Sequence, residues 1–564
     1  MTPQRTWYVG LSNTGHDPAI AIVDPNGCVA FAEATERFTQ VKRAWGVPPD
    51  IAGHLAHAID QTDFEIGRDR VEVSTCWKSV QSRPAEMLKN PLMSPNQLSA
   101  LSTYQASLFD VSGASFRLLD IADEPIKVRK FEHHSCHAAA AVYFSDARDA
   151  VCLVVDGEGE TGAVSQFSIT NRRLSRDWRS WNAGASLGLY YSWLTLRCGF
   201  SDVLGEEWKV MGLAAFGTVR EELVDPLQRI LSFKNHRPEP CCSEVMAEVE
   251  AQVRAFARGS SDPVMQAADL AASGQYVYGL FADELLSGCA KSENRNLLLT
   301  GGCALNSSYN GTIRSRFGFE QVDVPPCPAD DGNAIGAALL AWSADNNAPI
   351  PKSDRSAYFG SLPDRQAIAR CMAYAAGSLR ITELAGDQPL VTANLLAKGK
   401  IIGVMKGSAE FGPRALGNRS ILADPRSHQM KDRLNKLVKG REAYRPFAPV
   451  IAEHLVDDWF QTPEPSPYMA KTLQWRSTSK ELVPAVVHTD GTGRLQTVRH
   501  DQNPWLADLL EAFERISGVP IILNTSLNIM GKPIAHSVED AVAMLMTTGL
   551  DAVLLENVLI EKPS

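Results

Sequence analysis

The chain is organised around residues 131–141, which read Phe-Glu-His-His-Ser-Cys-His-Ala-Ala-Ala-Ala. The alanines favour a helix, and residues 126–129 before them predict a short strand. On a helix, His133 and His137 stand four residues apart, so both imidazoles leave the same face one turn apart. Two imidazoles placed in this way can bind one metal ion. A pair of histidines on a helix surface is the alternative interpretation.

A buried strand with an acidic end follows this helix. Residues 151–155 form a continuous apolar run, which is typical of a strand buried on both faces. The run ends in Asp156, and Gly157 and two glutamates come directly after it. A carboxylate at the carboxyl end of a buried strand lies where α/β sheets bind their ligands. An ordinary tight turn would explain the glycines but not the carboxylates beside them.

The N-terminal segment reads as a strand, a polar loop and a hairpin. Residues 7–11 predict the strand, 12–17 the loop, and 19–33 a hairpin that turns at 24–27. Actin-like ATPase folds begin in this order. The loop is expected either to cradle a phosphate or to form a plain turn.

Another buried strand, at residues 297–300, runs into Gly301 and Gly302. Such a turn lets a nucleotide lie against bare backbone. Further on, Asp330 comes just before a helix rich in alanine, which is a good position for a carboxylate ligand. Lys209 either meets a phosphate or is a solvated surface lysine.

Composition excludes several classes of protein. The chain has 564 residues, 45% hydrophobic and 21% charged, which is ordinary for a globular protein with more than one domain. Its net charge of −10 argues against nonspecific nucleic-acid binding. We find no signal peptide and no apolar run that spans a bilayer. The 11 cysteines are interpreted as reduced thiols, so a cytoplasmic protein is expected, with neither nucleic acid nor membrane as a partner.

A polar, proline-bearing segment at residues 344–362 predicts a domain boundary, with one domain over 1–350 and a second over 360–564. Residues 47–110 and 220–290 read as helical. A strand is expected at 400–405. The stretch 411–445 is a local basic cluster, suited either to anions or to a salt-bridge network. Its members are Arg414, Arg419, Arg426, Arg433, Lys436, Lys439, Arg441 and Arg445.

Several short motifs together carry a resemblance to a known family. They are His133-x-x-x-His137, Asp156-Gly157, residues 209–214 (Lys-Val-Met-Gly-Leu-Ala), 301–306 (Gly-Gly-Cys-Ala-Leu-Asn), 412–420 (Gly-Pro-Arg-Ala-Leu-Gly-Asn-Arg-Ser) and 524–526 (Asn-Thr-Ser). Over essentially its whole length the chain resembles the O-carbamoyltransferases of antibiotic and nodulation-factor biosynthesis. The string at 412–420 is the most specific of the motifs.

The resemblance implies a mixed α/β protein. The first domain would have the actin-like ATPase fold of the tRNA threonylcarbamoyl transferases, and the second would resemble threonylcarbamoyl-adenylate synthases. Family members use carbamoyl phosphate and ATP with Mg²⁺ to make carbamoyl-adenylate in the second domain. The carbamoyl group then passes to a hydroxyl of a small-molecule acceptor at a metal site in the first.

Residue roles are implied by the same motifs. His133, His137, Asp156 and Asp330 would hold a divalent metal, with Fe²⁺ expected and Mn²⁺ or Zn²⁺ as alternatives. His16 would be the base that activates the acceptor hydroxyl, and Arg414 and Lys439 would act in adenylation. The remaining binding residues would be Asn13, Gly157, Lys209, Gly301, Gly302, Asn306, Arg419, Arg445, Arg494, Asn524 and Ser526.

The sequence departs from the family pattern at one place. An arginine often follows the glycine ahead of Glu410, whereas this chain has Ser408 there. Lys406 is the candidate to replace the lost phosphate contact. The sequence does not name the acceptor or the oligomeric state.

The chemistry of a carbamoyl group agrees with the pattern of residues. A carbamoyl carbon is a poor electrophile, so AMP supplies a better leaving group and arginines neutralise the phosphates. A metal held by histidine and aspartate supplies a Lewis acid. Two other functions were considered: a tRNA-modifying or RNA-binding protein, and a sugar-kinase-like ATPase. Stimulation by tRNA would favour the first, and release of ADP in place of AMP and pyrophosphate would favour the second.

Overall fold

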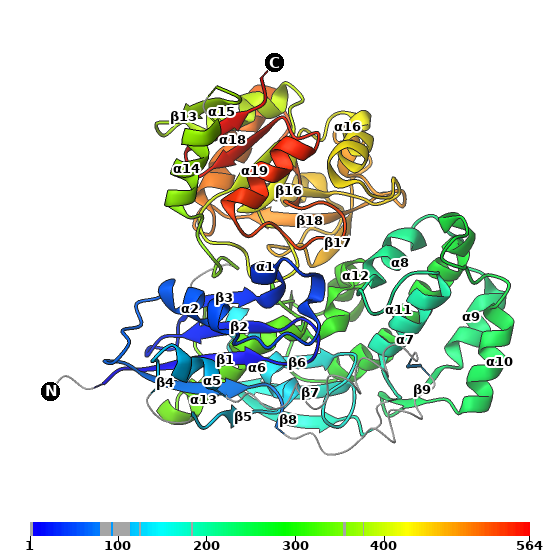
Figure 1. Cartoon of the computed structure of the whole chain (residues 1–564). Helices are drawn as coiled ribbons and strands as arrows, with labels where there is room; N and C mark the ends of the chain where they lie inside the picture. The colour runs from blue at the N-terminus through cyan, green and yellow to red at the C-terminus, as the bar shows by residue number, and fades with distance from the viewer. Residues whose placement is uncertain are drawn as a thin grey trace. The chain divides into compact units, whose positions relative to one another are not determined.

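The computed structural model describes residues 4–78, 92–93, 113–122, 126–181, 184–353, 357–375 and 377–563. The chain divides into two compact units (Figure 1): Met1–Thr35 with Arg43–Asp354, and Glu36–Lys42 with Arg355–Ser564. Each unit has its own sheets and core. The predicted helical segment 47–110 lies in large part outside the described residues.

The segment Glu36–Lys42 groups with the second unit, although the sequence placed it in the first domain. Its side chains bond to backbone of that unit. Arg37, 5% exposed, donates through Nη2 to the Gly412 carbonyl at 2.9 Å, and Gln40 Nε2 donates to the Ile534 carbonyl at 3.1 Å. No local pattern predicts such contacts, because they join residues several hundred positions apart.

The first sheet of the first unit has the strand order β3-β2-β1-β4-β5. As predicted, the chain begins with a strand and a hairpin, and β1 pairs antiparallel with β2 and parallel with β4. The fifth strand is shorter than expected and begins at Arg129 rather than 126. The bounds are β1 Thr6–Ser12, β2 Ala19–Val23, β3 Val29–Ala34, β4 Arg70–Thr75 and β5 Arg129–Lys130.

The second sheet repeats this arrangement with the order β12-β11-β6-β7-β8. In each sheet an antiparallel meander is extended by parallel strands on the free edge of its first strand. This duplication is characteristic of the actin-like ATPase fold, so the predicted fold class is confirmed for the first unit. The bounds are β6 Ala150–Val155, β7 Val164–Thr170, β8 Arg173–Arg179, β11 Asn296–Thr300 and β12 Gln321–Asp323.

Two helices link the sheets of the first unit. Helix α6 (His133–Phe144) packs against β6 and β11, helix α13 (Asn333–Asn346) packs against β1 and β2, and the two helices pack on each other. Glycine permits the close approach. A Cβ at Gly336 would lie 2.0 Å from the Cys136 carbonyl oxygen of α6, and one at Gly10 would lie 1.9 Å from the Ala334 carbonyl oxygen of α13. The predicted histidine pair is therefore anchored by backbone-to-backbone contact.

Replacing Gly336 by alanine is expected to destabilise the first unit by about 1–3 kcal/mol, the usual cost of overpacking a core. The added methyl meets backbone on α6, which cannot rotate away as a side chain would. Calorimetric melting is the measurement. Gly279→Ala is the control, because its Cβ would meet only Tyr309 carbons at 3.7 Å and 3.8 Å in a helix interior. Equal melting of the two variants would contradict the expectation.

The remaining elements of the first unit are mostly helices, as expected, with two differences. A hairpin, β9 with β10, interrupts the stretch 220–290, and β4 lies within the stretch predicted as helical. The bounds are α1 Thr35–Thr39 at the junction of the units, α2 Ala52–Asp60, α5 Ala114–Leu118, α7 Leu187–Arg197, α8 Glu207–Ala214, α9 Glu221–Gln228, β9 Leu231–Lys234, β10 Arg237–Pro240, α10 Ser243–Val253, α11 Ala268–Cys289 and α12 Ser307–Phe317.

The second unit is built on one sheet, in the order β13-β21-β20-β14-β15-β19-β16-β18-β17. Alternate residues of its central strands face opposite sides. Ile421 and Leu523 pack in one hydrophobic cluster with residues of α14, α16 and α19. Leu422 and Ile522 pack in another, with residues of α15 and α18. Helices therefore cover both faces of the sheet.

The strand predicted at 400–405 is confirmed as β14. The strand bounds are β13 Arg380–Glu383, β14 Ile402–Met405, β15 Arg419–Ala423, β16 Ala448–Ala452, β17 Lys471–Gln474, β18 Thr492–Val498, β19 Ile521–Ser526, β20 Ala552–Leu555 and β21 Val558–Glu561. The helix bounds are α14 Arg365–Ala375, α15 Gln388–Ala397, α16 His428–Arg433, α17 Val456–Trp459, α18 Pro504–Ser517 and α19 Val538–Thr547. None of the described helices is both long and apolar enough to cross a membrane.

Candidate functional site

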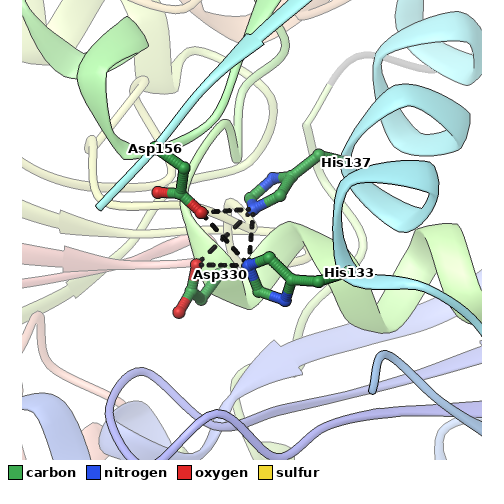
Figure 2. A group of neighbouring side chains, drawn as sticks. All are labelled: His133, His137, Asp156 and Asp330. Atoms are coloured by element: carbon green, nitrogen blue, oxygen red, sulfur yellow. Dashed lines mark hydrogen bonds and ion pairs between the residues drawn. The ribbon is translucent and has the colours of Figure 1, made fainter. Parts of the chain in front are cut away.

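Four buried side chains of the first unit converge on one point (Figure 2). His133 and His137 come from α6, Asp156 from the end of β6, and Asp330 from the turn before α13. One ligand atom from each lies within 4.8 Å of all the others. The two Nε2 atoms are 3.2 Å apart, and Asp156 Oδ2 lies 3.1 Å and 3.2 Å from them. The structure thus brings together the residues predicted as metal ligands.

Backbone contacts hold these side chains in place. Glu132 caps α6 by accepting from the Ser135 amide at 2.9 Å. Glu160 accepts from the His133 amide at 3.0 Å and 3.1 Å, and both carboxylates suit the positive end of the helix. Asp156 Oδ1 accepts from the Gly302 amide at 2.9 Å, which leaves Oδ2 facing the imidazoles.

The electrostatics of the group are those of a site that needs a cation. Burial would lower the pKa of His133 and His137, but hydrogen bonds with Asp156 and Asp330 outweigh it and raise both. Burial would raise the pKa of Asp156, but the two histidines hold it well below its usual value. Two ionised carboxylates thus lie buried beside two imidazoles, and either protons on the imidazoles or a divalent ion would neutralise them.

The spacing of the donors fits a metal ion. With metal–ligand bonds of about 2.1 Å, neighbouring ligands lie about 3.0 Å apart in an octahedral site and about 3.4 Å apart in a tetrahedral one. Asp330 Oδ1 lies 3.5 Å from each Nε2, and the other separations are 3.1–3.2 Å. A mixed set of two nitrogens and two carboxylate oxygens suits iron, manganese or zinc.

Two further residues touch this group, and the sequence analysis missed both. Asn333, fully buried at the start of α13, places Nδ2 3.1 Å from His137 Nε2 and 3.3 Å from His133 Nδ1. The Trp77 ring stacks on the His133 ring with centroids 4.5 Å apart. The position of Asn333 three residues after Asp330 was the available signal for the first. Nothing local indicated Trp77.

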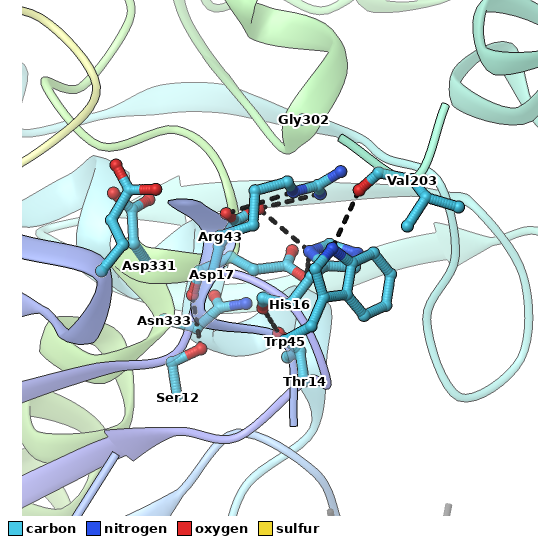
Figure 3. A network of polar contacts seen from close by, with 12 residues as sticks. Ser12, Thr14, His16, Asp17, Arg43, Trp45, Val203, Gly302, Asp331 and Asn333 are labelled. Carbon is cyan, nitrogen blue, oxygen red and sulfur yellow. Dashed lines mark hydrogen bonds and ion pairs between the residues drawn. The ribbon is translucent and has the colours of Figure 1, made fainter. Parts of the chain in front are cut away.

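The loop after β1 brings His16 beside this group (Figure 3). His16 Nδ1 lies 3.0 Å from Asp17 Oδ2 and 3.7 Å from Asp330 Oδ2. The loop is tied to the site from below as well, since Ser12 Oγ donates to the Asp330 carbonyl at 2.6 Å. Asn13 Oδ1 accepts from the Thr75 hydroxyl. His16 is therefore a neighbour of the candidate metal centre, through Asp330.

The glycines predicted at the site take different positions. Gly301 has φ of 90°, and a Cβ there would lie 2.3 Å from the Val155 carbonyl oxygen, so only glycine fits. Gly302 donates its amide to Asp156. A Cβ at Gly157 would meet no atom within 4 Å, which leaves room for a ligand at its Cα.

Two polar residues predicted to bind substrate or nucleotide have protein partners instead. Asn306 caps α12 by accepting from the Tyr309 amide at 3.2 Å, and its Nδ2 donates to Gln275 at 3.1 Å. Lys209 is buried and lies 2.6 Å from Glu206 Oε1, so it is not a solvated surface lysine.

In the second unit, the structure sorts the basic cluster into paired and unpaired members. Arg426 pairs with Asp424 at 2.6 Å and Arg433 with Asp551 at 2.9 Å. Arg419 is fully buried, and its guanidinium donates to backbone carbonyls of residues 361, 406, 407 and 418. Arg419 therefore holds the loop in place, and the predicted ligand contact does not match this position.

The other basic residues gather without matching acids. Arg414 and Arg494 have no carboxylate partner among the described residues, and Arg441 donates to the side chain of Asn435 and to the Pro446 carbonyl. Arg445 lies 3.7 Å from Glu442 Oε2. Burial, together with the charges of Arg494 and Arg445, lowers the pKa of Arg414 well below its usual value. Partly buried cations that repel one another form a site for an anion.

Lys439 completes this cation cluster, which we define as Arg414, Lys439, Arg441, Arg445 and Arg494. It ends a π-helical turn, Leu434–Lys439, that continues α16 and is closed by Gly440 with φ of 59°. Its Nζ bonds only neutral oxygens, on Ser526 and on Asn528, the latter at 2.8 Å and 3.1 Å. Burial and the charges of Arg441 and Arg445 lower the pKa of Lys439. π-Helical turns are frequent at functional sites.

The loop at 412–420 is fixed by buried polar groups. Glu410 Oε1 accepts from the amides of Leu416 and Asn418, each at 2.7 Å. Asn524 Nδ2 donates to the Ala415 carbonyl at 3.1 Å and to Gln496 at 2.7 Å. Arg414 therefore projects from a rigid loop.

The departure at Ser408 is not replaced by Lys406. Lys406 Nζ lies 3.4 Å from the Glu556 carbonyl and 3.8 Å from its carboxylate. The Gly407 amide donates to the same carboxylate at 2.8 Å. An acidic partner thus neutralises Lys406 within the second unit.

Comparisons with known proteins agree over both units. The family model described as Carbamoyltransferase N-terminus matches residues 8–339, and Carbamoyltransferase C-terminus matches residues 393–562. Nodulation protein U of Sinorhizobium fredii is 30% identical, over 97% of this chain and 98% of that protein. An uncharacterized protein of Synechocystis is 30% identical, over 99% and 97%.

Among solved structures, component A of the (R)-2-hydroxyglutaryl-CoA dehydratase of Acidaminococcus fermentans is 13% identical, with a TM-score of 0.33 over 60% of this chain and 99% of that one. The two family models together span most of the sequence and fall one on each unit. The chain belongs to the carbamoyltransferase family.

Proposed function

We propose that the chain is an O-carbamoyltransferase that makes carbamoyl-adenylate from carbamoyl phosphate and ATP, then transfers the carbamoyl group to a hydroxyl of a small molecule. The observation that carries this proposal is the cation cluster of the second unit. Arg414, Lys439, Arg441 and Arg494 lie together with no carboxylate partner among the described residues. Substrates that bring several phosphate charges would balance such a site.

The proposed reaction balances in three steps. Water cleaves carbamoyl phosphate to carbamate and phosphate. A carbamate oxygen then attacks the α-phosphorus of ATP, and the bond to the leaving pyrophosphate breaks. Finally the acceptor oxygen attacks the carbamoyl carbon, AMP leaves with the bonding electron pair, and the hydroxyl proton goes to a base.

In the adenylation step the second unit positions phosphates and stabilises charge. Negative charge grows on pyrophosphate as it leaves, and fixed guanidinium and ammonium groups stabilise it without reorganising. Arginine forks suit two phosphate oxygens at once. Arg414 on its rigid loop and Lys439 at the end of its helical turn come from segments about 25 residues apart in sequence, so two independently fixed cations would hold one substrate.

In the transfer step the first unit supplies a base beside the candidate metal centre. His133, His137, Asp156 and Asp330 would hold a divalent ion there, Fe²⁺, Mn²⁺ or Zn²⁺ by the chemistry of the donors. When bound, the ion supplies a Lewis acid for the carbamoyl oxygen. His16, 34% exposed, lies 3.7 Å from Asp330 and would take the hydroxyl proton.

His16→Asn is expected to separate the two half-reactions. The variant should still exchange labelled pyrophosphate into ATP when carbamoyl phosphate is present, because His16 lies in the other unit from the cation cluster. Transfer should fall about 10²–10⁴-fold, the usual contribution of a general base. Loss of both activities, or of neither, would defeat this division of labour.

The function itself is tested by its products. Enzyme, ATP and carbamoyl phosphate are incubated with alcohol-bearing natural products and a panel of sugars, and mass spectrometry reads carbamoyl addition. Release of AMP and pyrophosphate with a carbamoylated product is the expected result. Release of ADP would indicate a kinase, and turnover that depends on added tRNA would indicate an RNA-modifying enzyme.

A further inference from the structure

The loop that carries His16 holds a charged pair that the transfer step does not yet use. Arg43 clasps the Asp17 carboxylate, with Nη2 2.9 Å from Oδ2 and Nε 3.3 Å from Oδ1 (Figure 3). The same Oδ2 lies 3.0 Å from His16 Nδ1. The pair is partly buried, with side-chain exposures of 26% for Asp17 and 15% for Arg43.

The backbone is shaped to bring these three side chains together. Asp17, Arg43 and Ala44 all have positive φ, at 54°, 59° and 39°, a conformation that non-glycine residues adopt at some cost. The Asp17 amide donates to the Arg43 carbonyl at 3.0 Å, and the Gly46 amide donates to the Gly15 carbonyl at 2.9 Å. Two segments far apart in sequence are thus stitched together at His16.

An aromatic wall completes the setting. The His16 ring meets the Trp45 ring edge-on, with centroids 5.2 Å apart, and the Arg43 guanidinium lies 5.4 Å from the Trp45 centroid. Trp45 is itself fixed, since its indole N–H donates to the Val203 carbonyl at 2.8 Å. The imidazole is therefore oriented by packing as well as by Asp17.

The groups around His16 fix which ring nitrogen carries a proton. Burial would raise the pKa of Asp17, but Arg43 and His16 hold it well below its usual value, so Asp17 remains an acceptor only. Arg43, being a cation, cannot accept from the ring. Asp330 Oδ2 is 3.7 Å away, beyond hydrogen-bond distance, and Glu207 is a nearby charge that contacts Ser192 rather than His16. Nδ1 is thus the donor to Asp17.

We propose that Asp17 is a positioning residue that fixes His16 as the Nδ1–H tautomer and leaves the Nε2 lone pair to take the acceptor's hydroxyl proton. His16 Nε2 has no hydrogen-bond partner among the described residues. This inference rests on the proposed function for the identity of the reaction, but not for the tautomer. The role is the one that a buried carboxylate plays behind a histidine base.

The proton balance of this arrangement is complete. The acceptor oxygen bonds to the carbamoyl carbon, the bond from that carbon to AMP breaks, and the hydroxyl proton moves to Nε2. The imidazolium then shares its Nδ1 proton with Asp17, which Arg43 keeps ionised, so the carboxylate takes no proton. Loss of the Nε2 proton to solvent restores the base.

The test reads the tautomer directly. Protein labelled with ¹⁵N at histidine and loaded with Zn²⁺, which is diamagnetic, is examined by long-range ¹H–¹⁵N NMR at one pH where the imidazole is neutral. The His16 signals are those that vanish in His16→Asn. The expected result is the Nδ1–H form in the wild type and a shift toward the Nε2–H form in Asp17→Ala.

A matched control removes the corresponding carboxylate one turn later in the chain. Asp24 accepts from the amides of Asn26 and Cys28, at 2.9 Å and 2.8 Å, and has only this turn-capping role. Asp24→Ala should leave the His16 tautomer unchanged. An Nε2–H tautomer in the wild type would overturn the proposal without any variant, and so would an unchanged Nδ1–H form in folded Asp17→Ala.

A kinetic arm separates this inference from the proposed function. With a sugar that the wild type carbamoylates, Asp17→Ala should slow transfer about 10²–10⁴-fold and retain pyrophosphate exchange. Unchanged transfer with a shifted tautomer would overturn the base role of His16. An unchanged tautomer would instead overturn its orientation by Asp17.

Discussion

Replacing His137 by alanine is expected to empty the metal centre and abolish carbamoyl transfer. The change removes one of four donors whose contacts are 3.1–3.5 Å, so the affinity should fall by more than about 100-fold, the upper range for loss of a supporting group alone. Elemental analysis of purified protein is the measurement. The wild type should hold close to one divalent ion per chain, and the variant almost none.

The control for this loss lies on the same helix. His134 is also buried on α6, but its Nδ1 contacts Ser165 Oγ at 2.7 Å and its ring does not enter the metal set. His134→Ala should therefore keep the ion. Active wild-type enzyme without metal, or full retention of metal in His137→Ala, would end the assignment.

Replacing Arg414 or Lys439 by alanine is expected to lower pyrophosphate exchange into ATP by about 30- to 1,000-fold in the presence of carbamoyl phosphate. Loss of one charge-assisted phosphate contact costs about 2–4 kcal/mol in the transition state, and each 1.36 kcal/mol is tenfold in rate. Both groups lack a carboxylate partner among the described residues, so no protein interaction explains their charge.

A third arginine distinguishes catalysis from general loss of positive charge. Arg433 belongs to the same basic stretch, but it pairs with Asp551 at 2.9 Å and donates to the Gly399 carbonyl at 2.7 Å. Arg433→Ala should retain exchange within a few-fold. Near-normal exchange in both Arg414→Ala and Lys439→Ala would place adenylation elsewhere in the chain.

Local pattern sufficed for much of the fold. The apolar run 151–155, the hairpin at 19–33 and the helix that begins at His133 all form as expected, because strand and helix periodicity are written in neighbouring residues. The spacing of His133 and His137 also put both imidazoles on one helix face. The match of both family models shows that the motifs carried the family as well.

Sequence position alone was a poor guide to the basic cluster. Arg419 and Arg433 lie in the same stretch as Arg414, yet one is buried among carbonyls and the other paired with an acid. Arg494, 80 residues from Arg414, joins it instead. Which cations lack a partner depends on which acids the fold brings near, and those acids are distant in sequence.

The sequence by itself determined the elements, the histidine pair, the acidic strand end and the family, since each is encoded in a short stretch. Only the tertiary structure decided that one sheet arrangement occurs twice, that Glu36–Lys42 groups with the second unit, and that Asn333, Asp17 and Arg43 reach the site. These features depend on contacts between residues up to about 400 positions apart. Such contacts form only when backbones approach closely, as Gly336 permits between α13 and α6, and no local periodicity records that approach.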